Sequence, residues 1–205
     1  GYGDNVPTFW KPMSTCSDVD HNLRAGRHFL AVHDLPTPEI TPGRLVLVGF
    51  AGCHPADLGR DPPLTLGRTY YFGPGGDGDA FVGHGFSEPD ETGRWTDGAR
   101  AFLFFALEAA PPGAASISVE ATSFSRLSDR RQEVTLIANG RSCGELVLTQ
   151  SAPRAQVVCP TGALRTGANT VRFGVSQPTR PADLGVSGDR RKLGLGLRTL
   201  TIEAR

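Results

Sequence analysis

The segment GFSEPDETGRWTDG, which runs from residue 85 to residue 98, holds the densest set of chemically versatile side chains in the chain. Four carboxylates lie close in sequence to one arginine and to one of only two tryptophans. Paired carboxylates can hydrolyse a glycosidic bond when one of them keeps its proton and the two stand at a defined separation. The candidates by residue type are Glu88, Asp90 and Glu91, but nothing near them in sequence would raise the pKa of a carboxyl group. We therefore favour a non-catalytic role for this segment.

The same segment could contact a sugar, which presents an apolar face and a polar rim. An aromatic ring can cover the face, while charged and amide side chains form hydrogen bonds with the rim. On a loop between strands, this interpretation makes ligand contacts of Trp95, Arg94, Glu88 and Glu91. The favoured alternative is structural. In that case Trp95 is a buried anchor of the fold, and Arg94 braces the loop by pairing with Glu88 or with Asp189.

Two further segments carry charges that could bind a ligand. The sequence GPGGDGD places Asp77 and Asp79 in a flexible loop, and such carboxylates suit a structural Ca²⁺, although Gly-Asp turns are also common without metal. The sequence GDRRKLG contains Asp189 and Arg190 and is basic, so it could meet an anionic glycan or a lipid head group. Its alternative interpretation is a solvated turn closed by Asp189.

Several other classes of function find no support in the sequence. The five histidines lack the i, i+4 spacing of a helical zinc motif, and Ser87 does not lie in a Gly-x-Ser-x-Gly elbow. The 21 basic and 21 acidic residues give a formal net charge of zero, which does not favour a nucleic-acid partner. No apolar run approaches the roughly 18 residues of a transmembrane segment. We therefore expect a domain that is more a binding module than an enzyme.

Glycine (26 residues) and proline (16 residues) are abundant, which indicates many turns and little helix. Residues 1–43 form a Pro-rich, irregular N-terminal arm, and residues 44–205 contain short apolar stretches at spacings of about ten residues. We expect RAFLFFALE to be a central strand, Ile117, Val119 and Ala121 to share one face of a strand, and Asn139-Gly140 to form a tight hairpin turn. The LGLGL stretch should pack closely against another backbone. These patterns predict an all-β fold, a two-layer antiparallel β-sandwich of jelly-roll type with an irregular N-terminal extension.

The four cysteines are compatible with two disulfides. Cys143 and Cys159 lie equidistant from Ser151, so an antiparallel hairpin centred there would place them opposite each other. We expect this bridge and, as a second one, Cys16–Cys53. Disulfides persist in oxidising compartments, which predicts a periplasmic or extracellular location.

Three motifs resemble a β-sandwich domain found on bacterial membrane glycosyltransferases and on phosphoglycerol-transferase-like proteins of surface polysaccharide assembly. The first motif leads from a Gly-aromatic-Ser segment through acidic residues and Pro to Gly-x-Trp-Ser/Thr-x-Gly. The second is an apolar strand, followed later by a Val-rich strand ending in Asn-Gly. The third is a Pro followed by Leu-Gly-x-Ser-x-Asp-x-Arg and Leu-Gly-Leu. In this chain they are Gly85–Gly98, AFLFFALE with Asn139-Gly140, and Pro181–Leu195. The match covers residues 64–205. The chain departs from the pattern at Phe86, where the family usually has Trp, and near Thr92, where a further aromatic is absent.

The resemblance implies a jelly-roll-like domain outside the cytoplasm that is associated with glycan handling. The favoured function is therefore a non-catalytic, extracytoplasmic carbohydrate-binding or accessory domain whose partner is a glycan or cell-surface polysaccharide. The alternative is a structural or protein-interaction subunit that assembles through its N-terminal arm. A polysaccharide hydrolase or transferase is the third interpretation.

Overall fold

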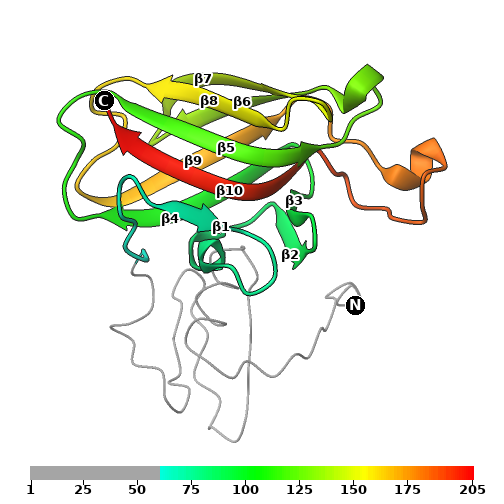
Figure 1. Cartoon of the computed structure of the whole chain (residues 1–205), viewed down its shortest axis with the longest axis horizontal. Coiled ribbons are helices and arrows are strands. Elements are labelled where there is room, and N and C mark those ends of the chain that lie inside the picture. Colours follow the sequence, from blue (N-terminus) through cyan, green and yellow to red (C-terminus); the bar gives the residue numbers. More distant parts are fainter. Residues whose placement is uncertain (1–60) are drawn as a thin grey trace, which may run out of the picture. The chain divides into compact units, whose positions relative to one another are not determined.

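The computed structural model of the protein describes residues 61–205, which belong to one compact unit. This part of the chain folds into two antiparallel β-sheets packed face to face, and none of it is α-helical (Figure 1). The short helical turns are of the 3-10 type: η2 (Asp77–Phe81), η3 (Ser128–Arg130) and η4 (Pro181–Leu184). The predicted two-layer antiparallel sandwich is confirmed. The predicted arm over residues 1–43 and the predicted boundary at residue 44 lie outside the described residues.

The larger sheet is built around the last strand of the chain. Its strands follow the order β2 (Phe86–Asp90), β3 (Gly93–Thr96), β10 (Leu195–Ala204), β5 (Ala115–Ser123) and β8 (Arg154–Cys159). The short strand β1 (Thr69–Tyr71) pairs with β10 further along the same edge that β3 occupies. Strands β1 and β3 therefore both pair with the same edge of β10, and the η2 turn lies between them in the chain.

The smaller sheet has four strands and a simple antiparallel ladder. Its order is β4 (Arg100–Leu107), β9 (Gly167–Val175), β6 (Gln132–Ala138) and β7 (Arg141–Leu148). The β6–β7 hairpin turns at Asn139-Gly140, where both residues have positive φ, 47° and 84°. This confirms the predicted hairpin, because a tight two-residue turn matches the strand twist only when both central residues take up that conformation.

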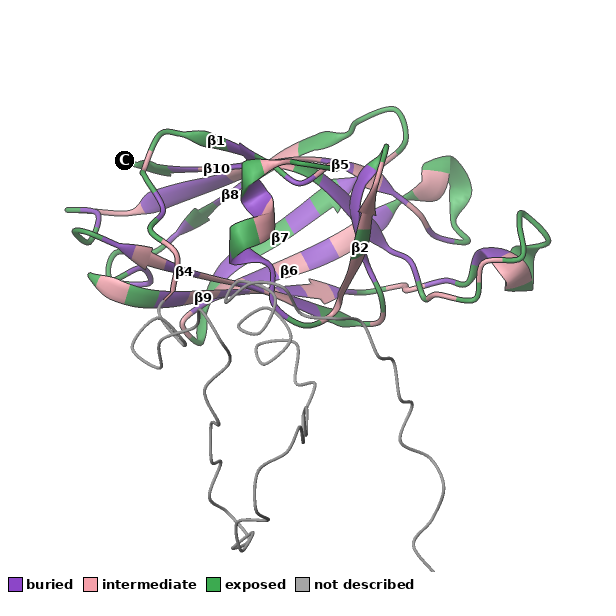
Figure 2. Ribbon diagram, turned by 90° about the horizontal axis from the view of Figure 1, so that it is seen from below, coloured by how far each residue is buried: buried purple, intermediate pink, exposed green. Residues whose placement is uncertain are grey.

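Buried residues alternate with more exposed ones along the strands (Figure 2). The buried positions are mostly apolar and form the core between the two sheets. On β5, Ile117, Val119 and Ala121 are buried, as their spacing predicts, and each lies opposite a buried residue of β10. The opposing β10 residues are Ile202, Leu200 and Leu197. Removing this apolar surface from water, at roughly 25 cal/mol per Å², is the main term that holds the two sheets together.

The apolar segment RAFLFFALE forms an edge strand, not the central strand that its composition suggested. Only β9 pairs with β4 along its length. The other edge of β4 is covered by two short segments, through hydrogen bonds from Leu64 N to Ala106 O (2.8 Å) and from Gly83 N to Phe102 O (2.8 Å). Both faces of this strand carry apolar side chains, which explains its apolar sequence. Phe102 and Phe104 lie on the outer face, and their stacked rings have centroids 6.3 Å apart.

The Cys143–Cys159 disulfide is present, but the geometry behind its prediction was wrong. We expected both cysteines on one hairpin, whereas β7 belongs to the smaller sheet and β8 pairs with β5 in the larger sheet. The chain crosses between the sheets around Ser151, so the disulfide joins the two layers at one edge of the sandwich. Cys16 and Cys53 lie outside the described residues, and their pairing stays a prediction.

Within residues 61–205, no helix is long and apolar enough to cross a membrane.

Candidate functional site

The segment of residues 85–98 is a β-hairpin, not the loop between strands that we predicted. Strands β2 and β3 pair through Phe86–Thr96 and Pro89–Arg94. The Asp90 carboxylate organises the turn, because its Oδ1 accepts a hydrogen bond from Thr92 N at 2.9 Å. The four acids of the segment thus occupy different places. Glu88 lies on β2, Asp90 and Glu91 lie at the turn, and Asp97 follows β3.

Arg94 points into the protein and is only 3% exposed. Its Nη2 binds Asp79 Oδ1 at 2.7 Å, and its Nη1 donates to Ser87 O at 2.9 Å. The predicted partners, Glu88 and Asp189, are not the ones it uses: Glu88 is exposed to solvent, and Asp189 binds a different arginine. Among the described residues, no atom accepts a hydrogen bond from Arg94 Nε. Arg94 is therefore a buried brace between the hairpin and η2.

Trp95 is buried, at 7% exposure, as the structural interpretation predicts, but it does not lie between the sheets. It pairs across β3 and β10 with Gly196, whereas its neighbour Arg94 pairs with the core residue Leu197. Cross-strand partners share a face, so Trp95 covers the outer side of β10. A Cβ at position 196 would lie 3.0 Å from the indole ring. Both glycines of LGLGL thus meet side chains, not the backbone we expected: Gly196 faces the Trp95 ring, and Gly194 faces the Val175 side chain.

The two acids of the GPGGDGD segment each bind an arginine. Asp77 Oδ2 accepts from Arg68 Nη2 at 2.7 Å, and its Oδ1 accepts from Tyr71 N at 2.9 Å. These contacts, the backbone hydrogen bond first, hold the pKa of the Asp77 carboxyl below its ordinary value. Asp79 holds Arg94. In the described part of the chain, no three His, Cys, Asp or Glu side chains gather in a set that could hold a metal ion, and a structural Ca²⁺ at Asp77 and Asp79 stays a prediction.

The glycines of this segment have a steric role. A Cβ at Gly76 would lie 2.1 Å from Tyr71 O, and one at Gly78 would lie 2.7 Å from the same oxygen. The segment therefore folds tightly back onto the end of β1, and only glycine fits at these two positions. This packing presents the backbone of residues 73–76 beside the side chain of Tyr71.

The hairpin meets the third sequence motif in space, although not through the pair that we predicted. Asp189 binds Arg191, with Oδ2 2.7 Å from Nη2, and this pairing lowers the pKa of Asp189. Arg191 Nη1 in turn donates to Ser87 Oγ at 3.0 Å. Lys192 N donates to Asp97 Oδ1 at 2.9 Å. Arg190, which we had considered as a ligand contact, is exposed.

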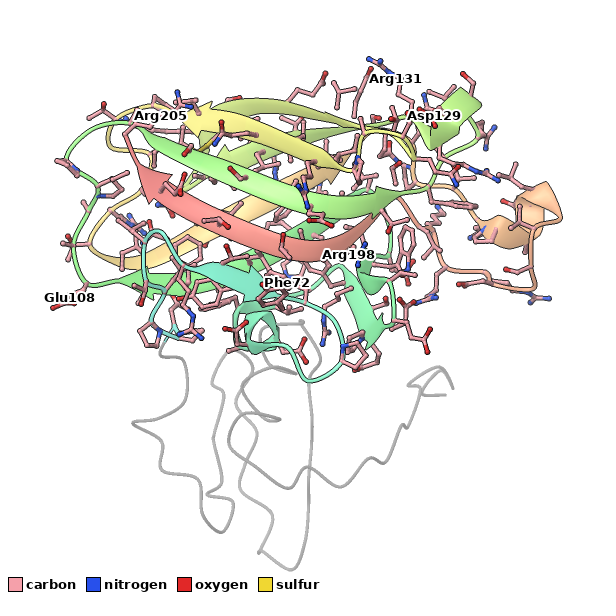
Figure 3. All side chains as sticks on the ribbon, viewed as in Figure 1. Phe72, Glu108, Asp129, Arg131, Arg198 and Arg205 are labelled. Carbon is pink, nitrogen blue, oxygen red and sulfur yellow. A yellow bond between two sulfur atoms is a disulfide. The ribbon has the colours of Figure 1, made fainter. Side chains whose placement is uncertain are left out.

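An open groove of about 590 Å³ lies on the outer side of the larger sheet. Figure 3 marks Arg198 of β10 at this place, beside Phe72, the residue that follows β1. The groove is formed by the end of β1, the glycine-rich segment, the β2–β3 turn and the outer positions of β5 and β10. Its lining residues are Tyr71, Gly73, Pro74, Gly75, Gly76, Asp77, Glu91, Gly93, Glu120, Arg198 and Thr199.

The groove combines one accessible ring with charged groups. Tyr71 is 59% exposed, more than any other large apolar residue among residues 61–205. Glu120 binds Arg154, with Nε 3.1 Å from Oε2, and stands 3.8 Å from Arg198 Nη1. Arg198 lies at a β-bulge, because the register of β10 against β5 shifts between Leu197 and Thr199. The bulge turns the Arg198 side chain outward, where it is 53% exposed.

Of the ligand contacts predicted from the sequence, the structure brings only Glu91 to this groove. Sequence reasoning did not identify Tyr71, Glu120 or Arg198, because they come from three separate strands. A signal for Glu120 was nevertheless present, since it alternates with the buried Val119 and Ala121 and must face outward. Arg198 follows the buried Leu195 and Leu197, so alternation from these two leucines also places it outward.

No protein-family model matches the chain, and no curated protein matches it. Among solved structures, a CBM36-1 domain of a multidomain xylanase from the hindgut metagenome of Trinervitermes trinervoides is similar, with 12% identity over 67% of this chain and 97% of that one, and a TM-score of 0.42. A family 35 carbohydrate-binding module from an environmental isolate has 14% identity over 61% and 77% of the two chains, with a TM-score of 0.34. The CBM35 from Cellvibrio japonicus Abf62 has 16% identity over 60% and 79%, with a TM-score of 0.32.

Proposed function

We propose that the domain binds an oligosaccharide, without catalysis, in the groove between β1, the β2–β3 turn and β10. The observation that carries the proposal is the exposed Tyr71 ring in a groove whose wall also holds Glu91, Glu120 and Arg198. A pyranose ring offers an apolar C–H face for the aromatic ring and hydroxyl groups for the carboxylates and the guanidinium. The open form of the groove suits a chain of sugars better than a small molecule that must be enclosed.

The ion pair of Glu120 favours binding over hydrolysis. A hydrolase would need one of two carboxyl groups to deliver a proton to the leaving group. Glu120, one of the two glutamates here, is already bound by Arg154. Arg94 and Trp95, the most distinctive pair of the hairpin, are buried and brace the fold, so they do not contact the ligand.

The finer proposal is an accessory domain of cell-surface glycan handling, located in the periplasm or outside the cell. The Cys143–Cys159 disulfide supports an oxidising compartment. The resemblance to the domains of surface polysaccharide assembly rests on motifs that lie together in space, since Ser87 of the first contacts Arg191 of the third. The alternative of a subunit that assembles through residues 1–43 concerns a part of the chain outside the described residues.

A panel of soluble polysaccharides in affinity electrophoresis, followed by titration calorimetry with the retained glycan, tests the proposal. Replacing Tyr71 by Ala should weaken binding by about tenfold or more, because the sugar loses its aromatic platform. Glu91→Gln should weaken it by about tenfold, since a hydrogen bond to a charged acceptor contributes about 1.5–3 kcal/mol.

Glu88→Gln is the matched control, because Glu88 is an exposed acid of the same hairpin that does not line the groove. It should leave both affinity and melting temperature unchanged. Equal losses in Glu88→Gln and Glu91→Gln, or full affinity in Tyr71→Ala, would place the glycan elsewhere. Absence of any retained polysaccharide would contradict glycan binding itself.

A further inference from the structure

We propose that one end of the sandwich, formed by the loops that carry η3 and η4, docks onto an anionic lipid bilayer. The two loops are residues 124–131 and residues 177–193, and both project from the same end of the two sheets (Figures 1 and 2). In Figure 3 the labels of Asp129 and Arg131 mark the η3 loop. We call this end the loop tip. It is remote from the C-terminal end of β10, and its residues do not line the groove.

A buried glutamine holds the bases of the two loops side by side. Gln132 is fully buried, and its Nε2 donates to Phe124 O at 3.1 Å and to Gln177 O at 3.0 Å. Its Oε1 accepts from Ser176 Oγ and from Gln177 N, both at 3.0 Å. Every polar atom of the amide therefore serves to join the loops. The loop tip is a single surface with a fixed base.

The loop tip exposes large apolar side chains that a soluble loop does not need. Leu127 is 40% exposed, Leu184 is 38% exposed and Val186 is 54% exposed. They make up half of the large apolar residues that are exposed in residues 61–205, the others being Tyr71, Val147 and Val158. Gathered apolar exposure of this kind marks a surface that interacts with something.

The η4 loop presents its apolar pair on an ordered scaffold. Gly185 adopts positive φ at 65°, and Val186 N donates to Pro181 O at 3.0 Å. At its base, Thr179 and Leu193 exchange two backbone hydrogen bonds, of 2.8 and 3.0 Å. The loop is thus held in a shape that keeps Leu184 and Val186 outside, although it has the internal hydrogen bonds of a folded segment.

Basic side chains lie in the same two loops as the apolar ones. Arg180, Arg190 and Lys192 are exposed and form no ion pair with another described residue. Of the two acids in the same loop, Asp189 is paired with Arg191, which leaves Asp183 as the one opposing charge. On the η3 loop, Arg126 and Arg130 add positive charge, and Asp129 opposes it. Basic residues around an apolar tip are complementary to a bilayer with anionic head groups.

The apolar residues decide between a bilayer and an anionic polysaccharide. A polysaccharide acid would be recognised by the arginines alone and would leave Leu184 and Val186 in water. A bilayer accepts both, because the branched side chains enter the boundary between head groups and acyl chains while the guanidinium groups remain at the phosphates. A domain seated in this way would keep its groove free to hold a glycan at the membrane surface.

Sedimentation of the protein with vesicles tests the proposal. Vesicles of phosphatidylcholine with about 30% phosphatidylglycerol should bind the protein, and pure phosphatidylcholine vesicles should bind it weakly. Binding should fall as salt rises, because screening weakens the electrostatic part. Leu184→Ser with Val186→Ser should weaken binding by at least about tenfold. Arg190→Gln with Lys192→Gln should weaken it by about fivefold for each charge removed.

The matched control is Val158→Ser, which removes an equally exposed apolar side chain from β8 near the opposite end of the sandwich. It should bind vesicles like the unchanged protein. Absence of binding to anionic vesicles at low salt, or equal binding by the Leu184→Ser, Val186→Ser variant, would overturn the proposal. A different result would assign the loop tip to a polysaccharide instead. In that case a soluble anionic polysaccharide would displace the protein from the vesicles, and the Leu184→Ser, Val186→Ser variant would bind the polysaccharide as well as the unchanged protein does.

Discussion

Arg191 and Ser87, which stand 104 positions apart in the chain, are joined by a hydrogen bond of 3.0 Å from the guanidinium Nη1 to the serine Oγ. The same guanidinium binds both oxygens of Asp189, through Nε at 3.0 and 3.2 Å and Nη2 at 2.7 Å. A bidentate contact of this kind fixes the plane of the guanidinium, so that its remaining nitrogen is directed at β2. Asp189 therefore acts on the hairpin through Arg191 and not through Arg94.

Replacing Asp189 by Asn should lower the free energy of unfolding by about 0.5–1 kcal/mol, because Arg191 loses its carboxylate partner and the pair is partly screened by water. Chemical denaturation measures the change. Asp183→Asn is the control, since Asp183 is an exposed acid of η4 that forms no ion pair with a described residue. Equal effects of the two variants would mean that Asp189 contributes only general charge.

Asp79→Ala should be more damaging than Asp189→Asn, because it leaves a nearly buried guanidinium unpaired. The Arg94 side chain is 4% exposed and that of Asp79 is 40% exposed. Removing one partner of a fully buried pair costs about 3–5 kcal/mol, and the exposure of Asp79 lowers our expectation to about 1–3 kcal/mol. Thermal and urea unfolding test this. An Asp79→Ala protein as stable as the parent would show that water replaces the carboxylate without loss.

Trp95→Ala should destabilise the domain by about 3 kcal/mol or more, within the range known for large buried aromatic side chains. The ring packs over Gly196, lies edge-on to Phe124 at 6.5 Å, and donates from Nε1 to Thr92 Oγ1 at 2.9 Å. Differential scanning calorimetry measures the loss. Tyr71→Ala is the matched control, since an exposed ring should change stability by no more than about 0.5 kcal/mol. A small effect of Trp95→Ala would contradict its role as a brace.

Opening the Cys143–Cys159 bridge should lower the free energy of unfolding by about 3 kcal/mol, the value for a closed loop of this size. The two cysteines are 16 positions apart, and they join the edge strands of different sheets. Unfolding of the Cys143→Ser, Cys159→Ser protein in guanidinium measures the cost. Addition of dithiothreitol to the parent should produce the same shift, and a variant as stable as the oxidised parent would make the bridge dispensable.

Alternation and turn chemistry predicted most of the sandwich. The buried face of β5 and the turn at Asn139-Gly140 depend on neighbours in sequence, and both could be read locally. The position of β4 in its sheet could not, because pairing order depends on contacts between distant strands. Local reading also misled at Ser151, where symmetry about a turn suggested a hairpin within one sheet and the chain instead crosses between two.

The candidate site was harder to predict than the fold, for a physical reason. The hairpin residues Arg94 and Trp95 looked like ligand contacts because charge and aromaticity coincide there, but pairing with Leu197 and Gly196 of β10 buries both. Tyr71 comes from a strand of three residues whose neighbours gave no indication of a groove. A surface assembled from the edges of several strands has no pattern in any one of them.

Lowering the pH should destabilise the glycine-rich segment that forms one wall of the groove. The direction of this effect follows from the lowered pKa of Asp77 in the folded protein. The pKa of the Asp77 carboxyl in the folded protein is lowered, first by the hydrogen bond from Tyr71 N and then by Arg68. A carboxyl whose folded pKa lies below its unfolded value stabilises the fold above the ordinary aspartate pKa of about 4, and loses that contribution as the pH falls through the folded pKa.

The difference in melting temperature between the parent and Asp77→Asn should therefore be largest at pH 5–6 and should shrink as the pH falls below about 4. Melting curves between pH 2 and pH 6 measure it. Asp183→Asn is the control, because Asp183 forms no ion pair with another described residue. The glycan affinity of the parent should likewise fall as the pH drops below about 4. The reason is that the ionised Asp77 holds the segment of residues 73–76 against β1 through Tyr71 N. A gap between parent and Asp77→Asn that stays constant down to pH 2 would show that the Asp77 carboxylate does not stabilise this wall.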